Sequence, residues 1–350
     1  MNDKDRMYCV TLKRPMVLEE GYKGIPSPGK DEVLIKVRRI GLCGSDAIIY
    51  YGKHPYVSYP LVMGHEFSGE ITGLGEGVKS LAIGQRVAVI PHLVCGKCSQ
   101  CKTETFNFCE QLRCTGAEAD GAHCEFIVMP AVMAIPIPDN LSFDDAAMIE
   151  PACVAYHAAK RGEIKNGDTV LIVGAGPIGI FAMQSVKVLG ASRVYIADID
   201  EKRLKLALSL GADGVINVAQ EKITEGLVRL IGGTREVDVF FDCVGQNGEI
   251  LEEIILMAKR GSRVVMVGVL QMDYNIPHLP DFVQHELRLS GTTMYVPLDY
   301  RDMIKYLSEG RISTKGMITH HFPITDIIKV FREFIEEKKE YFFKIMFTLD

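Results

Sequence analysis

The strongest constraint on the fold is an alternation of two kinds of segment between about residues 168 and 292. Apolar runs rich in Val and Ile, such as "TVLIVGAG", "RVYIADID" and "SRVVMVGV", are separated by helix-like runs. Strands that alternate with helices form βαβ units around a parallel sheet buried on both faces. The sequence therefore predicts an α/β region with a parallel sheet.

The first strand of this region runs into a glycine-rich turn typical of dinucleotide binding. "LIVGAGPIG" has the spacing G-x-G-x-x-G, after a strand and before a helix. The first glycine permits a tight turn, the second lets the backbone approach a pyrophosphate, and the third allows close helix–strand packing. Free N–H groups at the start of the helix would bind the phosphates. We expect this cofactor-binding turn to comprise Gly174, Gly176, Pro177, Ile178 and Gly179.

An acidic residue at the end of the next strand indicates which dinucleotide is bound. Asp198 closes "VYIAD" about 20 residues after the glycine turn, where a carboxylate accepts hydrogen bonds from the adenosine ribose. Arg203 follows, and it either lies over the adenine or is an ordinary surface residue. Because the charge of Asp198 would repel a 2′-phosphate, the sequence favours NAD over NADP.

The remaining parts of the chain differ in pattern. From Tyr8 to about Val132, short strand-like runs are separated by Gly and Pro, whereas 297–350 reads as helical and ends in the strand-like "FKIMFTL". A length of 350 residues suggests about two domains. We expect no signal peptide, and "GAGPIG" interrupts the only uncharged run of membrane length, 169–186.

Four cysteines are concentrated between residues 95 and 109. The run "CGKCSQCKTETFNFC" places Cys95, Cys98, Cys101 and Cys109 as C-x2-C-x2-C-x7-C, which fits a structural zinc site with no open position. An iron–sulfur cluster is the alternative, but the bacterial ferredoxin run has its fourth Cys after three residues, followed by Pro. Since the charges of this lobe nearly cancel and the net charge of the chain is −6, we expect no nucleic-acid partner.

A second group of possible metal ligands is spread over three segments. His65 and Glu66 lie in "MGHEFSG", Cys43 lies in "GLCGSD", and Glu150 stands inside the apolar run "AAMIEPA". A buried glutamate is costly unless it is paired or bound to a metal. An isolated Cys is more often a small core residue, so the spacing alone does not bring these four residues together.

The motifs "GLCGSD", "MGHEFSGEI", "GQRVAV", the four-cysteine lobe, "MIEP", "VGAGPIG" and "ADID" occur in the order found in one family. Over nearly its whole length the chain resembles the zinc-dependent medium-chain alcohol/sorbitol dehydrogenases. The resemblance implies a GroES-like β-rich catalytic domain at 1–152 and 297–350, which includes the structural-zinc lobe at about 92–114. It also implies a Rossmann domain with a doubly wound parallel sheet at 153–296, and an active site between the two domains.

The resemblance also implies residue roles. Cys43 and His65 would bind a catalytic zinc, and Glu66 and Glu150 would line or complete its coordination sphere. Asp46 would orient His65 from behind, and Ser45 would hydrogen-bond the substrate hydroxyl and carry its proton. The substrate alkoxide would pass hydride to NAD, with Val244 and Val267 in the turns that border the nicotinamide.

The sequence departs from the family pattern in two places. Many alcohol dehydrogenases have a relay histidine where this chain has Ile48, so the proton needs another route, through Glu150 and water or through His54. The segment "DGAHCEF" carries His123 and Cys124 near positions that line the substrate pocket in the family.

The resemblance is closest to bacterial enzymes that act on polyols or hexonates, and we expect a secondary alcohol to be oxidised to a ketone. The alternatives are a polyol-phosphate dehydrogenase, an L-threonine 3-dehydrogenase-like enzyme and a non-catalytic NAD- or zinc-binding protein. The sequence does not decide between a neutral polyol and a sugar acid. We expect a cytoplasmic homodimer or homotetramer, with no membrane partner, that pairs through the edge strand near "LRLSGTTM".

Overall fold

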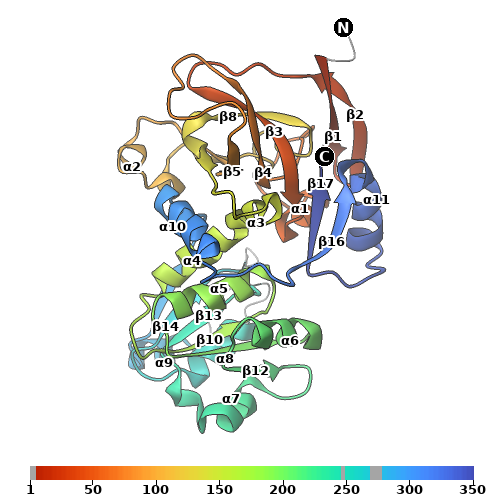
Figure 1. Ribbon diagram of the computed structural model, residues 1–350. Coiled ribbons are helices and arrows are strands. Elements are labelled where there is room, and N and C mark those ends of the chain that lie inside the picture. Colours follow the sequence, from red (N-terminus) through yellow and green to blue (C-terminus); the bar gives the residue numbers. More distant parts are fainter. Residues whose placement is uncertain (1–4, 246–248, 269–277) are drawn as a thin grey trace. The chain divides into compact units, whose positions relative to one another are not determined.

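The computed structural model describes residues 5–245, 249–268 and 278–350 (Figure 1). The chain forms two compact units, and the first is built from three separate segments. Unit 1 comprises Met1–Glu150, Val296–Ser308 and Met317–Asp350, and unit 2 comprises Pro151–Tyr295 and Glu309–Gly316.

Unit 1 is built around a seven-stranded sheet. The strand order is β16-β17-β3-β4-β5-β9, and β8 pairs with β3 beside this path. Only β16 and β17 run parallel, and the other pairs are antiparallel. The strands are β3 (Glu32–Gly41), β4 (Glu66–Leu74), β5 (Arg86–Val89), β8 (Phe126–Pro130), β9 (Ala134–Pro136), β16 (Ile318–Pro323) and β17 (Lys344–Thr348).

Two small sheets and several short helices complete unit 1. β1 (Arg6–Arg14) pairs with β2 (Val17–Gly24), and β6 (His92–Leu93) pairs with β7 (Arg113–Cys114). The helices are α1 (Gly44–Tyr50), α2 (Ser99–Lys102), α3 (Phe143–Ala147), α10 (Pro297–Ser308), α11 (Ile327–Val330) and a π-helical turn at Phe331–Glu336. α4 (Ile149–Arg161) begins where the chain passes from unit 1 into unit 2.

Strand β17, from the C-terminal part of the sequence, lies inside this sheet between β16 and β3. β17 pairs with β3, with Met346 opposite Gly41, so in Figure 1 the blue end of the chain lies among the red and orange strands. The strand-like run "FKIMFTL" is thus a strand. The sequence analysis missed β16, which stands between the helical segments expected in this region.

Unit 2 contains a six-stranded parallel sheet in the order β12-β11-β10-β13-β14-β15. The order reverses between β10 and β13, as in a doubly wound Rossmann fold, so the predicted fold class is confirmed. The strands are β10 (Thr169–Val173), β11 (Arg193–Asp198), β12 (Gly214–Asn217), β13 (Val239–Asp242), β14 (Arg263–Met266) and β15 (Arg288–Gly291). The helices are α5 (Pro177–Val188), α6 (Glu201–Ser209), α7 (Ile223–Ile231), α8 (Glu249–Met257) and α9 (Leu279–Gln284).

The uncharged run 169–186 is divided between two elements of unit 2. Every residue of β10 is buried, and the chain turns at Gly174 before α5 begins at Pro177. Among the described residues, no helix combines the length and the apolar character needed to cross a membrane.

A buried ion pair joins the start of β14 to the loop before β10. Arg263 Nη2 lies 2.7 Å from Asp168 Oδ2, and both side chains are largely buried. Arg263 Nη1 also donates to the carbonyl oxygens of Gly162, at 3.0 Å, and Glu163. The guanidinium therefore satisfies backbone groups as well as a carboxylate.

We predict that Arg263→Met lowers the free energy of unfolding by about 3–5 kcal/mol, because it leaves Asp168 buried without its cation. Chemical denaturation measures this change. The matched control is Lys205→Met in α6, whose 3.5 Å pair with Glu201 is exposed and should contribute less than about 1 kcal/mol. Equal losses in both variants would contradict the prediction.

Candidate cofactor and metal sites

The glycine turn of unit 2 has the geometry that a dinucleotide requires. Gly174 has a φ of 101°, which favours glycine. A Cβ on Gly179 would lie 1.8 Å from the carbonyl oxygen of Gly174, so helix and strand pack too closely for any side chain. A Cβ on Gly176 would meet nothing within 4 Å, so packing within the protein does not require this glycine. The open space beside the N-terminus of α5 fits a pyrophosphate.

Asp198 stands at the end of β11, beside this turn. Its Oδ2 accepts a hydrogen bond of 2.6 Å from the backbone N–H of Ala175, and its Oδ1 accepts one of 2.8 Å from Asp200. Arg203 Nη1 lies 3.9 Å from the same carboxylate. The backbone therefore fixes the carboxylate next to the glycine turn, where a ribose would bind.

The turn that follows β13 packs against the glycine turn, and the turn that follows β14 packs against the turn after β13. A Cβ on Gly174 would lie 2.8 Å from Val244 Cγ2, and one on Gly268 would lie 2.3 Å from the backbone nitrogen of Gly245. Buried Asp242 fixes the first turn by accepting bonds of 2.9 Å from Val244 and Gly245, and its carbonyl accepts one of 2.9 Å from Val267. Three carboxyl ends of strands thus meet at the point where the strand order reverses.

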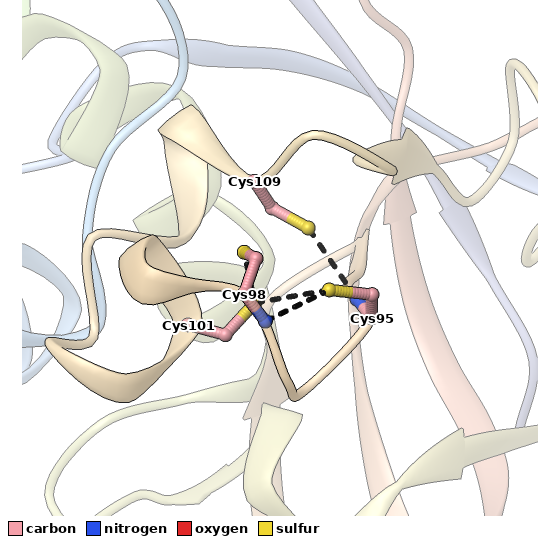
Figure 2. A group of neighbouring side chains, drawn as sticks. All are labelled: Cys95, Cys98, Cys101 and Cys109. Atoms are coloured by element: carbon pink, nitrogen blue, oxygen red, sulfur yellow. Dashed lines mark hydrogen bonds between the residues drawn. The ribbon is translucent and has the colours of Figure 1, made fainter.

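The four cysteines of the lobe converge on one point, with their sulfur atoms facing one another (Figure 2). Their Sγ atoms all lie within 4.8 Å of one another. Cys98 Sγ is 3.5 Å and Cys95 Sγ is 3.9 Å from Cys101 Sγ. Tetrahedral zinc with Zn–S bonds of about 2.3 Å would place its thiolates about 3.8 Å apart, so the cluster fits this ion.

Backbone N–H groups point at these sulfurs. Cys98 donates to Cys95 Sγ and Gln111 donates to Cys109 Sγ, each at 3.4 Å. Hydrogen bonds from the backbone of Lys97 and Cys98 lower the pKa of the Cys95 thiol to about 6, whereas burial raises the pKa of Cys101 to about 12. At neutral pH Cys101 would therefore be a thiolate only with a cation bound beside it.

A second cluster lies at the ends of two neighbouring strands of unit 1. Cys43 follows β3 and precedes α1, His65 precedes β4, and Glu66 is the first residue of β4. One ligand atom from each of these residues lies within 4.8 Å of the others. A thiol, an imidazole and a carboxylate are a donor set that suits zinc.

Asp46 lies beside the Nδ1 atom of His65. The Asp46 carboxylate is fully buried, accepts a bond of 2.9 Å from the backbone N–H of Cys43, and lies 3.5 Å from His65 Nδ1. Burial opposes a charge on His65, but Asp46 and Cys43 raise its pKa well above the ordinary value. With Nδ1 turned toward Asp46, Nε2 faces Cys43 and Ser45.

Ser45 lies between the two candidate ligands. Its Oγ donates to Cys43 Sγ at 3.2 Å and lies 3.4 Å from His65 Nε2. The hydroxyl is only partly buried. It is therefore placed to contact a molecule bound at this cluster.

Lys344 also contacts this cluster, a role that the sequence did not predict. Its Nζ donates to Glu66 at 2.6 and 2.9 Å, and both side chains are buried. Burial opposes the charge of Lys344, but Glu66 raises its pKa above the ordinary value. The signal in the sequence was a lysine within the largely apolar run "YFFKIMFTL".

Glu150 and His123 are not members of the group formed by Cys43, His65 and Glu66. Glu150 is buried in the first turn of α4, outside the three-residue group. His123 is fully buried, burial lowers its pKa to about 4, and neither ring nitrogen has a hydrogen-bond partner among the described residues. Its ring packs on Gly64, where a Cβ would lie 2.6 Å from His123 Cδ2. His123 therefore supports the backbone that leads into His65.

Comparisons with known proteins agree with this arrangement. The model of the alcohol dehydrogenase GroES-like domain matches residues 29–139, and that of the zinc-binding dehydrogenases matches residues 177–309. The chain is 32% identical to an L-galactonate-5-dehydrogenase of Escherichia coli, over 95% of this chain and 97% of that one. It is 32% identical to a sorbitol dehydrogenase of Bacillus subtilis, over 90% of each. An alcohol dehydrogenase of Escherichia coli complexed with NADH has a TM-score of 0.91 at 32% identity, and covers 99% of this chain and 100% of that one.

A dinucleotide turn in a doubly wound sheet, together with two candidate zinc sites, defines a nicotinamide-linked, metal-dependent oxidoreductase. More particularly, the chain belongs to the zinc-dependent alcohol dehydrogenase family. The predicted reaction class and the predicted cofactors, zinc and NAD, are confirmed at the level of the family. The roles of individual residues stay predictions.

We predict that Cys101→Ser removes one equivalent of zinc per chain and lowers the unfolding temperature, because a lobe with little apolar content loses its metal. Metal analysis after gel filtration measures the zinc. Cys114→Ala is the matched control, since Cys114 is a buried thiol of the same lobe outside the group of four. Full zinc content in Cys101→Ser would contradict a four-thiolate site.

Proposed function

We propose that the protein oxidises a secondary hydroxyl of a polyol or a hexonate to a ketone, and reduces NAD. The observation that carries the proposal is the group of Cys43, His65 and Glu66, with Asp46 behind His65. The similarity to a sorbitol dehydrogenase and to an L-galactonate-5-dehydrogenase supports this substrate class.

The residues of this cluster in unit 1 have distinct parts in the proposed mechanism. Zinc, when bound, supplies Lewis-acid polarisation of the substrate oxygen, and NAD accepts the hydride. Cys43, His65 and Glu66 would hold the metal, and Asp46 keeps His65 Nε2 turned toward it. Ser45 Oγ would accept the proton of the substrate hydroxyl.

The proton then needs a route to solvent. The relay position is occupied by Ile48, whose side chain cannot carry a proton. We assign this step to Glu150, which would act through water or complete the metal sphere, with half-buried His54 as the alternative.

In unit 2 we propose that NAD lies on Gly174, Gly176, Pro177, Ile178 and Gly179. Asp198 would bind the ribose and exclude a 2′-phosphate, and Arg203 would flank the adenine. Val244 and Val267 would border the nicotinamide. The packing of the turns at the carboxyl ends of β10, β13 and β14 supports the proposed places of Val244 and Val267.

We predict NADH formation, followed at 340 nm, with one compound of a panel that contains sorbitol, galactitol, xylitol, L-gulonate, L-galactonate, D-idonate, a polyol phosphate and L-threonine. The rate should fall by about 10³-fold or more in Cys43→Ala, because the metal loses a thiolate ligand. Cys9→Ala is the matched control, since it removes a buried thiol of β1.

The other outcomes of the panel have equally definite meanings. Activity with L-threonine alone would replace the polyol or hexonate assignment. Silence across the panel, in protein that retains zinc and binds NADH, would favour a non-catalytic binding protein.

We also propose that the protein is a cytoplasmic homodimer, or a homotetramer built from two such dimers. β15 is an edge strand of its sheet, and an unpaired edge invites pairing with a second copy. On neighbouring α9, Leu279 and Val283 are 54% and 67% exposed. All ten cysteines are free thiols, the state expected in a reducing compartment.

We predict that sedimentation velocity at micromolar concentration gives a species of two or four chains, because pairing of β15 with its copy satisfies the unpaired backbone groups. A single species with the 38.8 kDa mass of one chain would contradict this proposal.

A further inference from the structure

Lys344 is a buried cation whose hydrogen-bonding capacity is fully used. Its side chain is 3% exposed, and its ammonium donates to Glu66 Oε1 at 2.9 Å, Glu66 Oε2 at 2.6 Å and the carbonyl oxygen of Leu42 at 3.1 Å. An ammonium has three N–H donors, and all three are used here. Leu42 directly precedes Cys43, so one side chain holds the Glu66 carboxylate and the backbone next to Cys43.

The ion pair between Lys344 and Glu66 lies on three neighbouring strands. β17 supplies Lys344, β4 supplies Glu66, and β3 runs between them. In the register of the sheet, Gly41 of β3 faces Glu66 on one side and Met346 on the other. A Cβ on Gly41 would lie 2.3 Å from Glu66 Oε2, so the carboxylate occupies the space that this glycine leaves open.

The Lys344 ammonium and a bound metal ion would both interact with the Glu66 carboxylate. Lys344 engages both oxygens of Glu66, while one ligand atom each of Cys43, His65 and Glu66 lies within 4.8 Å of the others. Attraction between charges is strong where water is excluded. Any shift of Glu66 toward a metal therefore weakens its bond to Lys344, and the reverse also holds.

We propose that Lys344 competes with the metal for the Glu66 carboxylate and thereby limits how tightly the catalytic site holds its metal. Lys344 is thus a positioning residue that acts through Glu66. The proposal rests on the proposed role of Cys43, His65 and Glu66 as metal ligands.

A double-mutant cycle tests this coupling. Zinc release from the wild type, Lys344→Met, Glu66→Gln and the double variant is followed with a chromogenic chelator, and the release phase of this site is the one that disappears in Cys43→Ala. We expect Lys344→Met to slow this phase at least tenfold, because Glu66 then interacts with the metal alone. In the Glu66→Gln background the same change should alter the rate less than twofold.

Three results would overturn the proposal: unchanged release in Lys344→Met, faster release in Lys344→Met, or an equal slowing in the Glu66→Gln background. The last would show that the ammonium acts on the metal directly and not through Glu66. Lys36→Met, a half-buried lysine of β3, is the matched control and should release zinc at the wild-type rate.

Failure of this proposal can be distinguished from failure of the proposed function. The assay contains no substrate, so it does not depend on the substrate class. Loss of both release phases in Cys43→Ala, or of neither, would refute the proposed ligand set. Circular dichroism checks the fold of each variant, and if Lys344→Met does not fold, Lys344→Gln removes the charge but retains a donor and is used in the same cycle.

Discussion

Antiparallel pairing of β17 with β3 is the interaction on which the rest of unit 1 depends. It joins residues on opposite sides of the segment that forms unit 2, and so closes one sheet from two distant parts of the chain. It also brings Lys344 beside Leu42 and Glu66. Without this pairing, Glu66 would be a buried carboxylate beside Cys43 and His65, without the ammonium of Lys344 to balance its charge.

The two groups of candidate metal ligands balance their charges in different ways. The cluster of Cys95, Cys98, Cys101 and Cys109 is local, and backbone N–H groups of its own loop stabilise the thiolates. The cluster of Cys43, His65 and Glu66 draws its balance from elsewhere, with Asp46 behind the imidazole and Lys344 behind the carboxylate. A closed site suits a structural ion, whereas an adjustable one suits an ion that must exchange ligands during a reaction.

The features that the sequence predicted well are those whose physical cause is local. The glycine turn is specified by its own residues, through the positive φ of Gly174 and the close packing at Gly179. The spacing of the four cysteines likewise places their sulfurs on one short loop. The Lys344–Glu66 pair and the packing of His123 on Gly64 depend on which strands become neighbours, and no local pattern contains that information. β16 was missed for the same reason, because "ITHHFP" has no apolar alternation and is a strand only through its pairing with β17.

The position of β17 in the chain has a consequence for biosynthesis. A ribosome produces the chain from its N-terminus, and domains begin to fold in that order. The loop that carries the four cysteines is complete once Cys109 has emerged, so it can take up its ion while translation continues. Cys43, His65 and Glu66 emerge early too, but their counter-cation follows the whole of unit 2. Under the proposed ligand set, the catalytic ion therefore reaches its final electrostatic environment only after unit 2 and Lys344 have been translated.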